Sequence, residues 1–155
     1  MSPNSDCAKE CGSDIAAFQG LVNNEPNLSS APRVAITHSW GTTAMANSEA
    51  AGASFDLVIS LPRAYLPDDW SANSTTSYHY LQYDVDALSN VHMYLPGDSA
   101  FDSSAWQREV FDSGGLDLGP ITLGNGLDNH GRIARGPEDN LAALEYIDEL
   151  VRASE

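Results

Sequence analysis

The sequence predicts a single α+β domain, with a small, mainly antiparallel sheet covered by about four helices. Two observations lead to this class. The chain has 155 residues, of which 42% are hydrophobic, and a chain of this length suits one domain with one core. Strand-like alternation and helical spacing also follow one another irregularly, without an internal repeat. The domain is expected at residues 14–155, after a polar, mobile tail at residues 1–13.

Helical spacing is clearest near the two ends of the chain. A short amphipathic helix is expected to begin at Ser13 or Asp14 and to end within residues 23–27. A longer helix is expected to begin with Pro137 at its first position and to end near Ala153. Its apolar stripe consists of Leu141, Leu144, Ile147, Leu150 and Val151. We expect this stripe to dock on the sheet, where folding depends on it, or to form a seam between two copies.

Alternating residues predict two strands and a shorter edge strand. The first covers residues 33–40 and would place on one face Val34, Ile36, His38 and Trp40. The second covers residues 53–62 and alternates through Phe55, Leu57, Ile59 and Leu61. Pro62 ends this strand because proline cannot donate a hydrogen bond to the ladder. Residues 116–123 are expected to be extended at the edge of the sheet.

The middle of the chain is harder to assign. Residues 79–93 fit both a strand and a helix, and the helix is favoured because the alternation fails at Ala87. A turn is expected at residues 95–98, followed by a short helix over residues 103–111. Residues 124–131 contain three glycines and are expected to form a tight loop.

The charge balance restricts the partners. Asp and Glu number 22 against 7 Lys and Arg, and the formal net charge is -15. This charge repels phosphates, so no nucleic-acid partner is expected, whereas a basic protein or peptide would be attracted. Solubility alone would also explain the acidity, and the oligomeric state stays open. No membrane contact is expected, because no apolar run is long enough to span a bilayer, and a cytoplasmic location follows from the lack of secretory features in the first residues.

No metal site or cofactor is expected. Cys7 and Cys11 supply only half of a four-ligand zinc set, and they are expected to form a local disulfide or to remain free thiols. A metal site would need several histidines, or two with a carboxylate, to converge. The candidates are His38, His79, His92 and His130, with Asp84, Asp86, Asp98 or Asp128. Their spacing neither requires nor forbids this, and each histidine is expected to be structural or at the surface.

Short strings of residues are similar to known catalytic motifs, but none has the required context. The sequence contains no G-x-S-x-G nucleophile motif, no phosphate-binding glycine loop and no H-E-x-x-H zinc motif. Residues 111–115 are similar to the nucleophile loop of trypsin-like proteases, but the chain is too short for that fold. Residues 97–99 are similar to the nucleophile of GDS-type esterases, but the downstream spacing of Asp128 and His130 differs from that family. Both matches are interpreted as chance.

Two functions from different classes fit the remaining signals. The first is a binding module that recognises a protein or peptide through an acidic surface with aromatic anchors. Its candidate binding residues are Trp40, Trp70, Tyr78, Tyr80 and Tyr94. The second is a small enzyme of the cyclase, isomerase or tailoring type, with a pocket of titratable side chains. Its candidate catalytic residues are His38, His92, Tyr83 and Asp84.

A family resemblance over about residues 34–100 agrees with the first hypothesis. The motifs that carry it are, in order, Thr37–Gly41, Ala44-Met45, Phe55–Pro62, Asp69-Trp70, Leu81–His92 and Leu95–Asp98. This series resembles the bacterial branch of the Suppressor-of-fused-like domains. The resemblance implies an α+β interaction module of the immunity or partner-binding type, with no catalytic residue to transfer.

Overall fold

The computed structural model describes residues 3–62, 65–84, 86, 103–113 and 123–155. Its centre is a four-stranded sheet in the order β1-β2-β3-β4, in which every neighbouring pair is parallel. The strands are β1 (Val34–His38), β2 (Leu57–Leu61), β3 (Ser77–Tyr83) and β4 (Trp106–Phe111). The helices are α1 (Pro3–Asn23), α2 (Trp40–Ala50), α3 (Leu123–Arg132) and α4 (Pro137–Ala153).

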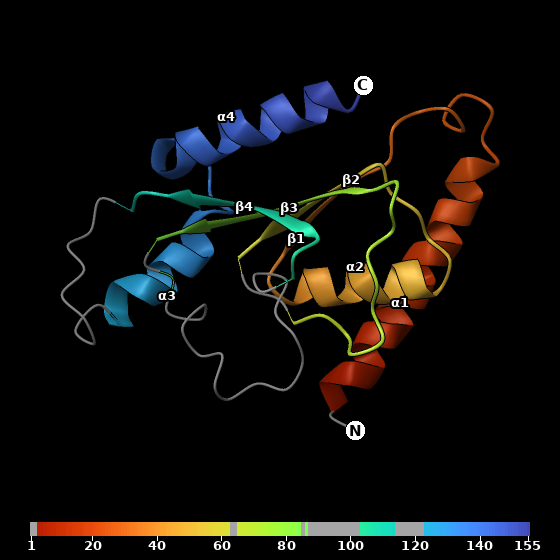
Figure 1. The fold of residues 1–155 in the computed structure, drawn as a ribbon, viewed down its shortest axis with the longest axis horizontal. Helices are drawn as coiled ribbons and strands as arrows, with labels where there is room; N and C mark the ends of the chain where they lie inside the picture. Colours follow the sequence, from red (N-terminus) through yellow and green to blue (C-terminus); the bar gives the residue numbers. More distant parts are fainter. Residues whose placement is uncertain (1–2, 63–64, 85, 87–102, 114–122) are drawn as a thin grey trace.

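The predicted fold class is wrong, because a parallel sheet with helices makes this an α/β fold rather than an α+β fold with a mainly antiparallel sheet. Parallel neighbours need a crossover between the end of one strand and the start of the next. Helix α2 supplies that crossover between β1 and β2 (Figure 1). Helix α2 was not predicted, because its buried side chains are mostly small or polar and form no apolar stripe.

Helices cover both faces of the sheet (Figure 1). Helix α2 lies against one face with α1 packed outside it, and α4 crosses the other face. The two helices α1 and α2 approach closely at Gly12, where a Cβ atom would lie 2.6 Å from the Cβ atom of Asn47. Glycine is therefore required at this contact between the helices.

A separate hydrophobic core fills each side of the sheet. The core on the α2 side consists of Met45, Ala46, Val58, Leu66, Tyr78, Tyr80 and Trp106. The core on the α4 side consists of Leu57, Ile59, Leu61, Leu81, Tyr83, Ile133 and Ala143. Strand β2 contributes to both cores and is buried along its whole length, as is usual for a parallel sheet covered on both faces.

Strands β1 and β2 and helix α4 confirm the predicted elements at those positions, although Trp40 begins α2 instead of ending β1. The helix favoured over residues 79–93 is wrong in its described part, because Ser77–Tyr83 is strand β3. This strand is buried on both faces, so its pattern of apolar residues does not report its period.

Two further predictions, for the second half of the chain, are also wrong. The expected short helix over residues 103–111 contains strand β4, and the expected loop over residues 124–131 lies within helix α3. The turn at residues 95–98 and nearly all of the edge strand at residues 116–123 fall outside the described residues.

The ends of the chain differ from the predictions in detail. Helix α1 begins at Pro3, so residues 3–13 are helical where a tail was expected. Helix α4 docks on the sheet through Ile147, Leu150 and Val151, which pack against the core on that side. Two other members of the predicted stripe, Leu141 and Leu144, are not part of this contact, and Leu141 is 55% exposed.

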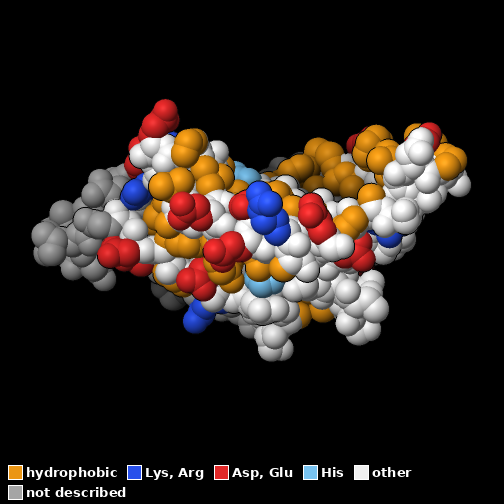
Figure 2. Space-filling view, turned by 90° about the horizontal axis from the view of Figure 1, so that it is seen from above, with side chains coloured by type: hydrophobic (Ala, Val, Ile, Leu, Met, Phe, Trp, Pro, Cys, Tyr) orange, Lys and Arg blue, Asp and Glu red, His pale blue; other side chains and the backbone are white. Residues whose placement is uncertain are grey.

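The surface on the α4 side carries acidic side chains that are spread among hydrophobic ones (Figure 2). They do not gather there into one continuous acidic patch. Within the described part of the chain, no helix is both long and apolar enough to cross a membrane.

Candidate active site

The sharpest local feature of the backbone is the turn that joins β1 to α2. Strand β1 ends at His38, helix α2 begins at Trp40, and the single residue between them is Ser39. Ser39 has φ 52° and ψ -124°, and among the described residues it is the one non-glycine residue with a positive φ. These angles are strained for a residue with a Cβ atom. A sharp, strained strand-to-helix turn of this kind presents a serine side chain at the carboxyl end of a parallel sheet.

Backbone and side-chain hydrogen bonds hold this turn in place. The N–H group of Ser39 donates to the carbonyl oxygen of Leu61 at 3.2 Å, and its own carbonyl accepts from the N–H group of Thr42 at 3.1 Å. The Thr42 hydroxyl lies 2.7 Å from the hydroxyls of both Thr37 and Ser60. Contacts with β1, β2 and α2 therefore hold Ser39 in its strained backbone conformation.

A histidine and an aspartate form a close pair at the same end of the sheet. Nδ1 of His130, in α3, lies 3.1 Å from Oδ2 of Asp86, which follows the end of β3. The side chain of Asp86 is fully buried, and that of His130 is 12% exposed. An Nδ1–H group that donates to the carboxylate leaves Nε2 as a proton acceptor. Within the described residues, this Nε2 atom has no hydrogen-bond partner.

The His130–Asp86 pair lies next to the Ser39 turn. The ring centroids of His38 and His130 are 5.1 Å apart. Nε2 of His38 lies 3.0 Å from the carbonyl oxygen of His130, and because a carbonyl only accepts, His38 is the donor. The residue directly before Ser39 is thus bonded to the backbone of the candidate base.

These three residues form the candidate triad: Ser39, Asp86 and His130. They occur in the chain order Ser, Asp, His, after the first strand, after the third strand and in the helix that follows the fourth. This order and the strand–serine–helix turn are those by which α/β-hydrolases assemble a nucleophile, an orienting acid and a base. Such an arrangement can activate a serine hydroxyl for attack on an acyl carbon.

The start of α2 supplies a second requirement of acyl chemistry. Trp40 follows Ser39 and is the first residue of this helix. The backbone N–H groups in the first turn of a helix have no partner within it, and the helix dipole makes this end positive. The N–H group of the residue after the nucleophile is one of the two donors that stabilise the oxyanion in such sites.

The structure brings only part of the predicted catalytic set to this place. His38 contacts His130, as described above. Tyr83 and Asp84 lie close by at the end of β3, but both make hydrogen bonds to other residues. The Tyr83 hydroxyl donates to Oδ1 of Asn140 at 2.9 Å, and Oδ1 of Asp84 accepts from the N–H group of Ser113 at 3.0 Å. His92 falls outside the described residues.

The predicted binding residues are not assembled into one exposed surface among the described residues. Tyr78 and Tyr80 are 2% and 0% exposed, in the core on the α2 side. Trp70 packs edge-on against Tyr78 at 5.5 Å between ring centroids, and Trp40 is half-buried at the start of α2. Tyr94 falls outside the described residues.

All three members of the candidate triad were missed as a catalytic set. The turn does not match the G-x-S-x-G motif, because Thr37 stands where that motif has its first glycine. A Cβ atom on Gly41, at the last position of the motif, would lie 3.8 Å from the Cβ atom of Thr37, so threonine is small enough to fit. Asp86 was considered only as a metal ligand, and His130 as a metal ligand or as part of the rejected esterase match at residues 97–99. A motif that allowed any small residue at its first position would have found Ser39.

Three titratable groups away from this site have shifted pKa values. Burial raises the pKa of Glu49, near the end of α2, against the effect of hydrogen bonds from Tyr78 and Trp70. Burial, followed by the hydrogen bond to Glu49, raises the pKa of Tyr78 to about 12. Burial lowers the pKa of His79, in β3. Tyr78 and Glu49 lie toward the start of β3 and the end of α2, at the opposite end of the sheet from Ser39.

Comparison with known proteins gives no family for the chain: no family model, no curated protein and no solved structure matches it significantly. The resemblance to Suppressor-of-fused-like domains therefore stays a prediction. Within the described residues, no group of three or more His, Cys, Asp or Glu side chains could hold a metal ion.

Proposed function

We propose that the protein is a serine hydrolase that cleaves a carboxylic ester or a related acyl compound. The observation that carries the proposal is the strained Ser39 turn beside the buried His130–Asp86 pair. Strain at a serine between a strand and a helix costs about 1–3 kcal/mol and persists where the surrounding structure enforces it. A purely structural turn would place glycine at these angles.

In the proposed reaction, Oγ of Ser39 attacks the acyl carbon while Nε2 of His130 accepts the hydroxyl proton. Asp86 holds the imidazole in the Nδ1–H tautomer and stabilises the imidazolium that forms. The oxyanion of the tetrahedral intermediate accepts a hydrogen bond from the N–H group of Trp40. His130 then donates its proton to the leaving alcohol, and an acyl-enzyme remains on Ser39. A water molecule, deprotonated by His130, releases the acid and restores the serine.

This proposal belongs to the enzyme class of the two functions considered from the sequence, but it uses different residues and a different reaction. The binding role with a basic protein or peptide stays a prediction, as does the cytoplasmic location. No contact between described residues favours the binding role over the hydrolase.

Labelling with a fluorophosphonate probe, which reacts with activated serines, tests the proposal directly. We expect the wild-type protein to be labelled and to hydrolyse p-nitrophenyl esters, and Ser39→Ala to do neither. His130→Ala is expected to lower the labelling rate by about 10²–10⁴-fold, as for loss of a general base. Ser29→Ala, at an exposed loop serine, is the matched control and should behave as the wild type. Absence of labelling in the wild type, or labelling that survives in Ser39→Ala, would overturn the proposal.

A further inference from the structure

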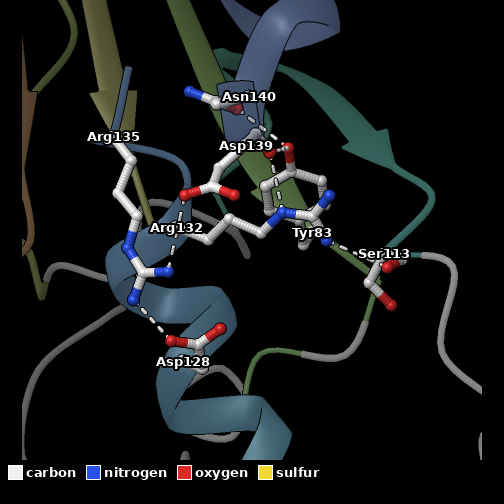
Figure 3. A network of polar contacts seen from close by, with 7 residues as sticks. All are labelled: Tyr83, Ser113, Asp128, Arg132, Arg135, Asp139 and Asn140. Carbon is white, nitrogen blue, oxygen red and sulfur yellow. Dashed lines mark hydrogen bonds and ion pairs between the residues drawn. The ribbon is translucent and has the colours of Figure 1, made fainter. Parts of the chain in front are cut away.

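A cluster of polar contacts joins the end of α3 to the start of α4 and to the ends of β3 and β4 (Figure 3). We call it the α3–α4 clamp, and it consists of Tyr83, Ser113, Arg132, Asp139 and Asn140. Arg132, two residues after His130, is its centre. Nε of Arg132 donates to the carbonyl oxygen of Asp139 at 2.8 Å, and Nη1 donates to that of Ser113 at 2.9 Å. The guanidinium also lies 4.5 Å from the ring centroid of Tyr83.

Asn140 completes the clamp from inside α4. This side chain is 1% exposed, and its Nδ2 atom donates to the carbonyl oxygen of Ile133 at 2.6 Å. Its Oδ1 atom accepts from the hydroxyl of Tyr83 at 2.9 Å. Asn140 leaves the helical conformation to do so, with φ -147° and ψ 29° inside α4. A buried amide with both ends satisfied fixes the position of the groups it joins.

The clamp holds the two segments that carry the base and the acid. Tyr83 lies three residues before Asp86, and Arg132 lies two residues after His130. These catalytic partners are 44 residues apart in the sequence, so tertiary contacts must bring them together. Asp84 adds a second tie, because its Oδ1 atom accepts from the N–H group of Ser113, the residue whose carbonyl binds Arg132.

We infer that Arg132 and Tyr83 are positioning residues for the catalytic histidine. They hold α3 against the end of β3, so that Nδ1 of His130 stays on Asp86 and Nε2 stays available for the proposed proton transfer from Ser39. This inference rests on the proposed function and extends it to residues that touch neither substrate nor nucleophile. Reacting groups need alignment to a fraction of an ångström, and a displacement of about 1 Å can cost about 10²-fold in rate.

Arg135 provides a matched comparison within the same segment. It is three residues beyond Arg132 and pairs with the carboxylates of Asp128 and Asp139. The Arg135 side chain is 45% exposed, and the side chains of Asp128 and Asp139 are each 56% exposed. Exposed ion pairs contribute little to stability, and this one involves no group of β3 or β4. Arg135 therefore controls for the loss of one positive charge next to the site.

The experiment compares Arg132→Gln, Arg132→Lys, Tyr83→Phe and Arg135→Gln in the complete chain. For Arg132→Gln we expect kcat for p-nitrophenyl acetate to fall by about 10–100-fold with little change in KM, because orientation is lost and not binding. Arg132→Lys keeps the charge, but an ammonium group cannot bridge two carbonyls as a guanidinium does. Its kcat should therefore lie between those of the wild type and Arg132→Gln. Tyr83→Phe removes one hydroxyl and should fold, and its kcat is expected to fall less than that of Arg132→Gln. Arg135→Gln should stay within about two-fold of the wild type.

Nitrogen NMR of labelled histidine gives a readout that needs no substrate. In the wild type, His130 should be in the Nδ1–H tautomer, and Arg132→Gln should shift it toward a mixture of tautomers. If Arg132→Gln and Tyr83→Phe match Arg135→Gln in kcat and in tautomer, the clamp is only a structural anchor and the inference is overturned, whatever happens to the melting temperature. If Ser39→Ala keeps full activity while the tautomer still responds to Arg132→Gln, the proposed reaction fails but the positioning of His130 stands.

Discussion

The two ends of α2 both carry polar groups enclosed by the fold, but their organisation differs. At the far end, the two oxygens of Glu49 accept from the Tyr78 hydroxyl at 2.6 Å and from Nε1 of Trp70 at 2.8 Å. The Tyr78 oxygen in turn accepts from the N–H group of Asn73 at 3.0 Å. At the near end, Ser39 is strained, and Nε2 of His130 has no partner within the described residues.

This difference separates a structural polar cluster from a candidate catalytic one. A network in which each group is satisfied lowers the free energy of the folded state and leaves nothing for a ligand. A strained backbone with an available proton acceptor costs free energy, and the surrounding structure must offset that cost. A shifted pKa does not make the distinction here, because the clear shifts in this part of the molecule belong to Glu49 and Tyr78.

The largest effect is expected from Asp86→Asn. An amide at this position would donate a hydrogen bond to Nδ1 of His130, which moves the proton to Nε2 and removes the acceptor that Ser39 needs. We expect kcat to fall by about 10⁴-fold while the fold is kept, as for the equivalent change in a serine protease triad. Measurement of ester hydrolysis and of circular dichroism checks both parts. A variant that folds and retains more than a tenth of wild-type kcat would remove Asp86 from the triad.

Ser39→Gly should separate the cost of strain from the function that it serves. The angles at Ser39 are the mirror image of an ordinary extended conformation, which glycine adopts freely. We expect the free energy of unfolding to rise by about 1 kcal/mol, after the entropy cost of glycine, and hydrolysis to be lost. Ser39→Ala is the control, because it removes the nucleophile but keeps the Cβ atom and the strain. Chemical denaturation would contradict this account if both variants had the same stability.

Only part of the scaffold could be predicted from single segments, and the site could not. Strand β2 and helix α4 were visible because their own residues carry the period and the stop signals, such as Pro62 and Pro137. Strand β3 was assigned as a helix because residues 79–93 were taken as one element, and the alternation fails at Ala87, beyond the end of the strand at Tyr83. Parallel pairing could not be predicted because it depends on the crossover helix α2. That helix contributes small and polar side chains to the core and has no apolar stripe by which to recognise it.

The site depends on contacts that no local pattern contains. Asp86 and His130 meet only because β3 and β4 run parallel, so that the segments after them reach the same edge of the sheet. Ser39 stands in a local pattern, but that pattern lies outside the G-x-S-x-G motif, which has glycine at a position where this turn accepts threonine. A physical criterion, two small residues around a serine between a strand and a helix, would have been more general than the motif.

The smallest effect, a difference in pH dependence, is expected at the far end of α2. Burial raises the pKa of Glu49 above its ordinary value, so between the unfolded and the folded pKa the folded state binds more protons at this group than the unfolded state does. The stabilisation from this group is therefore fully present below the unfolded pKa and is lost as pH rises through the folded pKa. We expect Glu49→Gln to lose less stability than the wild type between about pH 4 and pH 7.

The matched control for this change is Glu145→Gln, at an exposed glutamate of α4. Denaturant unfolding at several pH values measures the slope for each protein, and only Glu49→Gln should differ from the wild type. Hydrolysis at pH 7 should be unchanged in both variants, because Glu49 is bonded to Tyr78 and Trp70 and to no member of the triad. A loss of kcat in folded Glu49→Gln would show that the two ends of α2 are coupled, and the contrast between a structural and a catalytic cluster would have to be abandoned.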